Sequence, residues 1–176
     1  MGRPPVIDGI TGDPGSCSQL GGALRSQAAR LLALRGELRE RAADLRRVSA
    51  APDLVARIEA DLALLEALVD RIDAGGVALQ RYAQELAELA EGIRRLGAAA
   101  SAAGLELDEL RVVEPWGVLT TELAQRRGRA QPELQRQADR LASRLGRSRG
   151  VATRTLTEAT TLLAQAAQAA RIRALD

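Results

Sequence analysis

The stretch DLVARIEADLALLEALVDRIDAGGVALQRYAQELAELAEGIRRLG, residues 53–97, carries the clearest structural pattern in the chain. Aliphatic and small residues recur in it at alternating spacings of three and four, from Val55 to Gly97. This repeat is typical of a helix that buries one face against its neighbours. A second apolar row lies beside the first and consists of Leu54, Leu68, Tyr82, Leu89 and Leu96. Three apolar positions per heptad favour packing against more than one helix, and we predict a helix over about 53–100.

Two adjacent glycines, Gly75 and Gly76, interrupt this segment at its middle. Each glycine in a helix interior costs about 0.5 to 1 kcal/mol relative to alanine. Because the apolar period is strong on both sides, a continuous helix, straight or bent, is favoured over a turn. A kink or a close backbone crossing would explain the pair.

A second helix is predicted over about residues 16–49. Ser16 stands three residues before Gln19, which matches the capping box that satisfies free N–H groups at a helix start. The leucines of its apolar face recur every seven residues, at Leu24, Leu31, Leu38 and Leu45. Pro52 restricts the residue before it and suits the first turn of the next helix, so the boundary falls there.

The remaining segments complete an all-α fold. Residues 1–15 hold three prolines and four glycines, which predicts a flexible N-terminal tail. The helical period is lost from Ser101 to Glu114, which predicts a connecting loop with a short extended piece or one helical turn. Helices are expected over 117–127 and 131–173, with a break from Gly128 to Pro132. We therefore predict an elongated antiparallel bundle of three to four long helices with coiled-coil-like packing, in one domain over 16–176.

Charge is distributed unevenly along the chain, whose formal net charge is +2. Residues 25–47 carry seven arginines against three acids, residues 52–114 six against thirteen, and residues 122–154 nine against three. An acidic middle segment between two basic ones predicts neutralisation between neighbouring helices. This argues against a nucleic-acid-binding face, and the aromatic residues that stack on bases are also scarce.

The residue types needed for catalysis are missing. The chain has no histidine and one cysteine, Cys17, which removes imidazole bases, catalytic triads with histidine and multi-thiolate zinc sites. Glu85, Glu88 and Glu91 could gather a hard cation, but a solvated face that pairs with arginine on a neighbouring helix is favoured. We predict no catalytic, metal-binding or cofactor-binding residues, no cofactor, no small-molecule substrate and no enzyme. No apolar run is long enough for a transmembrane segment.

Two clusters are candidate interaction or turn residues. Trp116 and Gly117 follow a proline in the connecting loop. The simplest interpretation of Trp116 is a large apolar cap that closes one end of the bundle, and a recognition signature is the alternative. Arg126, Arg127 and Arg129 form a compact basic turn that could contact phosphate, against the alternative of a charged helix end.

The stretch GDPGSCSQLGGALRSQAARL, residues 12–31, together with a tryptophan between long helices, resembles type VII secretion substrates of the small Trp-x-Gly helical-hairpin class. Gly12, Asp13 and Pro14 match the start of the first helix in that family. The resemblance implies an antiparallel helical hairpin, often dimeric, exported without a cleavable signal peptide. The match departs from the family at the turn, where Trp116 and Gly117 are adjacent, and at position 86, where Leu86 replaces the acid of a Tyr-x-x-x-Asp/Glu signal.

The function predicted is a non-enzymatic helical protein–protein interaction module, similar to type VII secretion substrates or associated proteins. Its partner would be another helical protein or a second copy of this chain in a homodimer. It would be cytoplasmic, or exported without a cleavable signal peptide. The alternative is an intracellular homo-oligomeric coiled-coil scaffold that associates through the third heptad row. A basic helix that binds nucleic acid or an anionic membrane is a further alternative.

Overall fold

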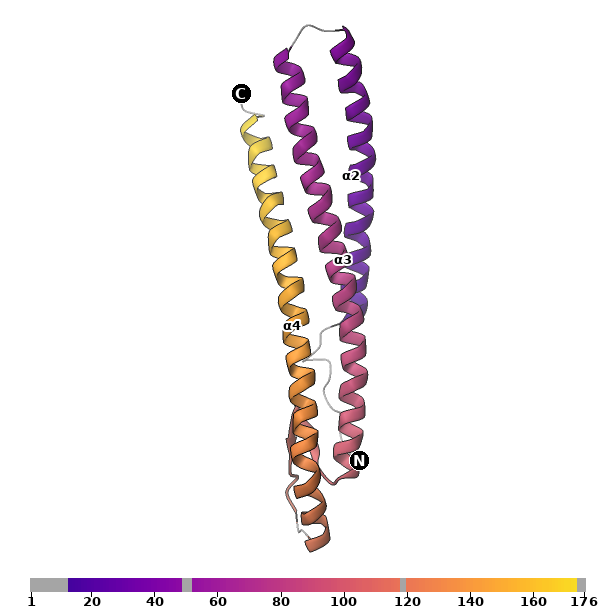
Figure 1. Ribbon diagram of the computed structural model, residues 1–176, viewed down its shortest axis with the longest axis vertical. Helices are drawn as coiled ribbons and strands as arrows, with labels where there is room; N and C mark the ends of the chain where they lie inside the picture. The colour runs from indigo at the N-terminus through magenta and orange to yellow at the C-terminus, as the bar shows by residue number, and fades with distance from the viewer. Residues whose placement is uncertain (1–12, 49–51, 118–119, 174–176) are drawn as a thin grey trace. The chain divides into compact units, whose positions relative to one another are not determined.

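The computed structural model describes residues 13–48, 52–117 and 120–173. Within them the chain forms three long helices and one hairpin of two short strands (Figure 1). The elements are α2 (Pro14–Val48), α3 (Pro52–Ala102), β1 (Glu106–Asp108), β2 (Arg111–Val113) and α4 (Thr121–Arg173). The all-α class is confirmed, whereas the bundle and its coiled-coil packing stay predictions.

Helix α2 begins at Pro14, two residues before the predicted start. The Asp13 carboxylate accepts the backbone N–H of Gly15 at 3.0 Å and that of Ser16 at 2.9 Å, so Asp13 is the N-cap. Proline suits the first helical position because its missing N–H would have no partner there. The predicted capping box at Ser16 is therefore wrong. The predicted tail, apart from Asp13 and the residues that α2 takes up, lies outside the described residues.

Contacts divide the chain into two compact units. Unit 1 comprises Met1–Ser16 and Tyr82–Gly150, and unit 2 comprises Cys17–Arg81 and Val151–Asp176. Helices α3 and α4 each contribute residues to both units. The prediction of a single domain over 16–176 stays a prediction.

In unit 2, helices α2 and α3 touch through their backbones. A side-chain carbon added at Gly76 would lie 2.7 Å from the carbonyl oxygen of Gly21, and one added at Gly21 would lie 2.8 Å from that of Gly76. Both distances are below the range of real contacts, so only glycine fits on either side. Helix α3 runs through this point without interruption, as predicted, and the glycine pair marks a close backbone crossing.

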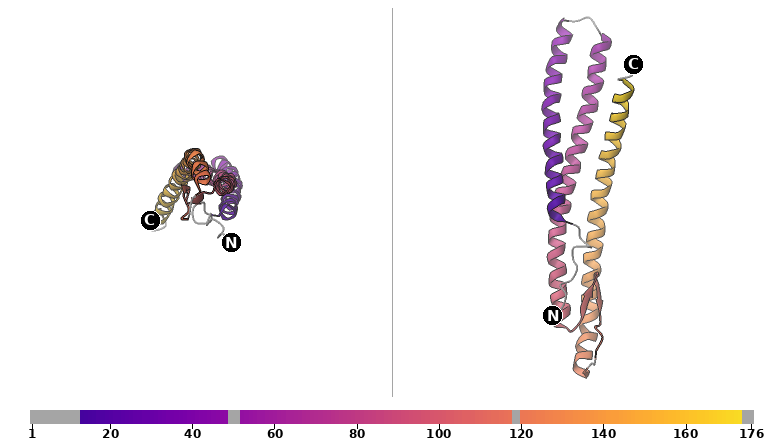
Figure 2. Two further views of the ribbon diagram at one scale, coloured as in Figure 1. Left: turned by 90° about the horizontal axis from the view of Figure 1, so that it is seen from below. Right: turned by 180° about the vertical axis from the view of Figure 1, so that it is seen from behind.

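Residues 52–81 of α3 lie between α2 and the C-terminal part of α4 within unit 2 (Figures 1 and 2). Gly75 faces Leu24 of α2 together with Leu156 and Ala159 of α4 at ordinary contact distances. The buried cluster of this unit consists of Ala28, Val69 and Ile72, with Leu24 and Leu31 packed against it. The ion pairs Arg25–Asp73, Arg35–Glu66 and Arg46–Glu59 follow in reverse order along α2 and α3, so the two helices are antiparallel.

The segment predicted as a loop with a short extended piece or one helical turn forms the β1–β2 hairpin of unit 1. Leu107 pairs with Val112 and Asp108 with Arg111, which leaves Glu109 and Leu110 as a two-residue turn. Both turn residues have positive φ, 45° and 70°, as a type I′ turn requires.

The hairpin lies beside α4 (Figure 2) and forms hydrogen bonds with glutamine side chains of that helix. The Val112 N–H donates to Gln135 Oε1 at 2.8 Å, and Gln135 Nε2 donates to the Leu110 carbonyl at 3.4 Å. The core of this unit joins α3, the hairpin and α4 and contains Ile93, Leu96, Ala100, Ala103, Leu105, Leu110, Val112, Leu134 and Ala138.

Helix α4 is a single helix, so the predicted break from Gly128 to Pro132 and the two predicted helices on either side of it are wrong. It begins at Thr121 rather than Gly117, and the Thr120 hydroxyl accepts the N–H of Leu123 at 3.3 Å. A proline inside a helix crowds the carbonyl four residues earlier, which here belongs to Gly128. Gly128 and Pro132 are both exposed, so that carbonyl can be hydrated while buried residues on the opposite face hold the helix.

Candidate interaction surfaces

The connection between β2 and α4 in unit 1 exposes the only tryptophan of the chain. Trp116 has a relative exposure of 104%, and Gly117 beside it has open space around it. The prediction that Trp116 caps the end of a bundle is therefore wrong. Leu110 and Val112 of the hairpin, and Leu105 just before it at 1% exposure, already form one core with residues of α3 and α4. The alternative, a recognition role for Trp116, stays open.

Arg127 forms a hydrogen bond with Pro115, the residue that precedes Trp116. It is 8% exposed, and its Nη1 donates a hydrogen bond to the carbonyl of Pro115 at 3.4 Å. The Nε atom is buried and has no hydrogen-bond partner. The sequence pattern does not reveal this burial, because Arg127 stands in a run of polar residues and its neighbours Gly104 and Pro115 are distant from it along the chain.

The three arginines predicted to form a basic turn do not converge. Arg126, Arg127 and Arg129 lie within α4, where successive side chains are about 100° apart around the axis. Arg126 and Arg129 are exposed, whereas Arg127 is buried. A shared phosphate cradle is therefore absent from this part of the described chain.

Three candidate interaction or turn residues lie at the start of α2, and those that the structure describes have a structural role. Asp13 caps the helix and Pro14 opens it, while Gly12 lies outside the described residues. The Ser16 hydroxyl donates to the Asp13 carboxylate, and this hydrogen bond, together with the backbone N–H groups of Ser16 and Gly15, lowers the pKa of Asp13. The carboxylate is stabilised in its charged form by the helix start.

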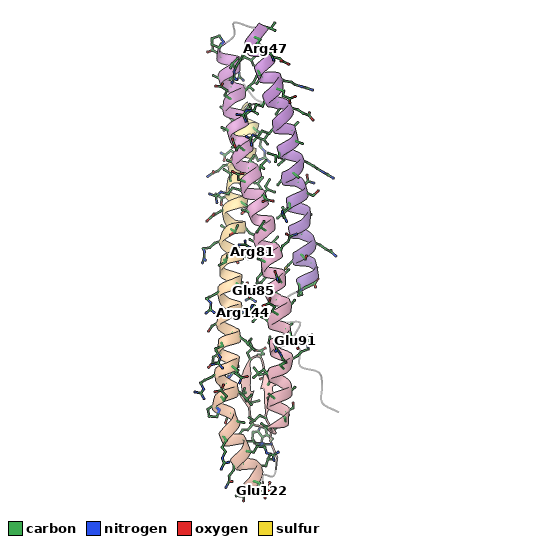
Figure 3. All side chains as sticks on the ribbon, turned by 45° about the vertical axis from the view of Figure 1, so that its right-hand side comes forward. Arg47, Arg81, Glu85, Glu91, Glu122 and Arg144 are labelled. Atoms are coloured by element: carbon green, nitrogen blue, oxygen red, sulfur yellow. The ribbon has the colours of Figure 1, made fainter. Side chains whose placement is uncertain are left out.

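The glutamates considered as cation ligands pair with arginine. Arg144 of α4 donates through Nε to Glu85 of α3 at 2.7 Å (Figure 3). Its Nη2 donates to Glu88 of the same helix, α3. These two hydrogen bonds, the one to Glu85 foremost, raise the pKa of Arg144. Glu91 pairs with Arg94 within α3, which lowers the pKa of Glu91. No group of metal-binding side chains occurs in the described residues.

Helix α2 carries a strip of exposed leucines in unit 2. Leu20, Leu34, Leu38 and Leu45 have relative exposures of 55%, 46%, 38% and 38%. At 3.6 residues per turn they fall within a strip about 40° wide, and we call them the leucine row. The fully buried residues of α2 are Gly21, Ala28 and Ala42. The backbone contact at Gly21 leaves no room for large side chains between α2 and α3. The four leucines of the leucine row therefore lie at the edge of this helix pair.

No family model, curated protein or solved structure matches the chain. The resemblance to type VII secretion hairpins therefore stays a hypothesis. Among the described residues, no helix is long and apolar enough to cross a bilayer.

Proposed function

We propose that this protein is a non-enzymatic interaction module that binds a helix of another protein through the leucine row of α2. The observation that carries the proposal is the exposure of four leucines in one strip of one helix. Single exposed aliphatic residues are ordinary on a protein surface, but several on one side of the same helix favour a docking site. An amphipathic partner helix would bury such a strip with its own apolar face.

The size of the surface limits the affinity it can supply. Full burial of a leucine side chain contributes about 1.5 to 3 kcal/mol, and these leucines are already roughly half buried. The leucine row therefore supplies about 3 to 5 kcal/mol in total, part of which offsets the loss of translational and rotational freedom. Binding through these leucines alone would be weak and reversible. From Leu20 to Leu45 the row extends over about 38 Å, so a partner helix of about 25 residues would cover it.

Photocrosslinking inside cells tests this proposal. Leu38 is replaced by a photoreactive phenylalanine analogue, and Leu32 receives the same replacement in a matched control. Leu32 is also exposed, at 51%, but lies about 140° from the centre of the leucine row around α2. We expect a discrete adduct at position 38 that Leu34→Gln and Leu45→Gln remove together. The same adducts at both positions, or none at position 38, would contradict the proposal.

A homo-oligomeric scaffold is the second candidate function. The same exposed leucine row could join two copies of the chain, since an apolar strip can serve both partners of a symmetric dimer. In the crosslinking experiment this function predicts an adduct of the chain with itself. Light scattering would then give a dimer or larger assembly at micromolar concentration, whereas a monomer would eliminate the scaffold.

Type VII export is the proposed cellular context for either function. Two observations support it: α2 starts at Pro14 directly after Asp13, and Trp116 is exposed in the connection between α3 and α4. We expect the full chain in the medium of its bacterial host with an intact N-terminus, and its loss from the medium when the export ATPase is deleted. Retention inside wild-type cells would contradict this context without bearing on the leucine row.

A further inference from the structure

Helix α4 carries a row of exposed arginines on one face in unit 1. They follow one another at spacings of seven, four and seven residues and are Arg129, Arg136, Arg140 and Arg147. At 3.6 residues per turn they fall within a strip about 40° wide that extends over about 27 Å, and we call them the arginine row. The acids of α4 within this span are Glu133, beside the row, and Asp139, about 80° from its centre.

Neighbouring helices do not neutralise the arginine row. Among the described residues, Arg129 and Arg147 form no ion pair and no hydrogen bond through their side chains. Arg136 and Arg140 pair with Glu133 of α4 itself, at 2.8 Å and 3.4 Å. The row and Glu133 together therefore leave a net charge of +3 on this face, which is available to a partner.

An open groove of about 480 Å³ between α3 and α4 borders the arginine row. Small and aliphatic residues line it, with one arginine from each helix: Gly92, Arg95, Leu96 and Ala99 of α3, and Arg140 and Leu141 of α4. The glutamines that bind the hairpin, Gln131 and Gln135, lie about 150° around α4 from the groove residues of that helix. The groove therefore lies on the side of the α3–α4 pair that the hairpin does not cover.

The helix pair of unit 2 shows which kind of partner matches such a row. Its ion pairs join three acids of α3 at spacings of seven to arginines of α2: Glu59 with Arg46, Glu66 with Arg35, and Asp73 with Arg25. Ion pairs at heptad spacing typically flank the apolar seam between two packed helices. The arginine row has the same flanking position beside the groove, because its centre lies about 70° around α4 from the centre of the groove residues.

We propose that this face of unit 1 binds an acidic amphipathic helix of a partner protein. The apolar stripe of that helix would cover the groove, and its acids, at heptad spacing, would pair with the arginine row. Gly92 and Ala99 leave room for such a helix because neither has a long side chain. A nucleic-acid backbone could also pair with the arginines, but it has no apolar face to cover the groove. This surface belongs to unit 1 and does not depend on the leucine row, which belongs to unit 2.

A labelled helical peptide of three heptads tests the proposal, since about 21 residues cover the length of the arginine row. The peptide has leucine and alanine at its seam positions and glutamate at the flanking positions, and in the neutral peptide glutamine replaces every glutamate. Fluorescence anisotropy follows binding of each peptide to the full chain at constant ionic strength. A labelled DNA duplex is the alternative polyanion. We expect saturable binding of the acidic peptide, about tenfold or more tighter than that of the neutral peptide or the duplex.

Two pairs of substitutions separate the arginine row from net charge. Arg129→Gln together with Arg147→Gln should weaken binding of the acidic peptide about fivefold, because exposed ion pairs each contribute little. The matched control is Arg39→Gln together with Arg111→Gln, which removes the same charge from exposed positions in α2 and the hairpin. This control should bind the peptide as the wild type does.

Ala99→Gln tests the groove itself. Ala99 is exposed, so the longer side chain fills the groove without entering the core, and circular dichroism checks that the fold is retained. We expect this variant to bind the acidic peptide about tenfold more weakly. Unchanged binding by Ala99→Gln or by the Arg129 and Arg147 variant would overturn the proposal. So would equal binding of the neutral peptide, tighter binding of the duplex or no saturable binding by the wild type. None of these results bears on the leucine row, whose crosslinks are formed in unit 2.

Discussion

Replacement of the two adjacent glycines of α3 by alanine should change stability in opposite directions. At Gly76 the new methyl group would lie 2.7 Å from the backbone oxygen of Gly21, where ordinary contacts begin at 3.4 Å. The backbones of α2 and α3 would therefore have to separate by about 0.7 Å at the crossing, the difference between these two distances. At Gly75 the nearest atom, Leu156 Cδ2, is 3.6 Å away, so alanine fits without movement.

The magnitudes follow from two opposing effects. Alanine stabilises a helix interior by about 0.5 to 1 kcal/mol relative to glycine, whereas overpacking a tight contact costs about 1 to 3 kcal/mol. Gly75→Ala should therefore raise the free energy of unfolding by about 0.5 to 1 kcal/mol. Gly76→Ala should lower it by roughly 1 to 2 kcal/mol, since the clash exceeds the gain in helix propensity.

Urea unfolding followed by far-UV circular dichroism measures both variants. Gly36→Ala is the control for helix propensity, because Gly36 is exposed in α2 with no atom within 4 Å of an added carbon. Gly21→Ala should resemble Gly76→Ala, and the double variant should cost less than the sum of the two, because the helices separate only once. If Gly76→Ala were as stable as Gly75→Ala, the backbone contact at Gly21 would not exist.

Three further predictions concern the hairpin, α4 and the start of α2. Glu109→Gly should stabilise the protein by about 1 kcal/mol in urea unfolding, because Glu109 has a φ of +45°, which glycine adopts without strain. Pro132→Ala should stabilise it by about 1 to 3 kcal/mol and slow amide exchange around Gly128, because it restores an N–H donor to that carbonyl. The pKa of Asp13 is lowered in the folded state, chiefly by the Ser16 hydroxyl. The stability that the charged Asp13 carboxylate contributes is therefore complete above its ordinary pKa of 3.8 and is lost as the pH falls through its folded-state pKa. Amide exchange in the first turn of α2 should therefore accelerate below about pH 4 in the wild type and lose this dependence in Asp13→Asn; an unchanged dependence in the variant would contradict the assignment.

Local signals predicted the existence of the helices well. The spacing of three and four between apolar residues through 53–97 predicts that α3 continues through Gly75 and Gly76. Pro52 predicts the start of α3, and it is the first residue of the helix. Two errors arose where a local rule competed with another effect. The helix break expected at Pro132 does not occur, because solvent exposure of the proline and burial of the opposite face keep α4 continuous. At the start of α2, Asp13 next to Pro14 provided a stronger cap than Ser16.

The candidate site was predictable by residue type but not by environment. The sequence predicts Trp116 and Arg127 as candidate interaction or turn residues, but it does not indicate that the tryptophan is exposed and the arginine buried. The segment between α3 and α4 forms a hairpin, whose turn residues Glu109 and Leu110 lack the Asn-Gly signal of a type I′ turn. The hairpin is stabilised by burial of Leu110 and by hydrogen bonds to Gln135, which lies 25 residues further along the chain.

The spacing of apolar residues and the positions of prolines determine structure over a few residues at a time. For this reason the amino-acid sequence alone establishes that the chain is helical and approximately where most of its helices start and stop. Which helix faces are covered depends instead on contacts between residues that are distant along the chain. The contact between Gly21 and Gly76 turns small residues of α2 toward α3 and leaves the leucine row partly exposed, while Arg127 is buried and Trp116 is exposed. Helical periodicity carries no information about which of two apolar rows a neighbouring element will bury, so these features required the folded chain.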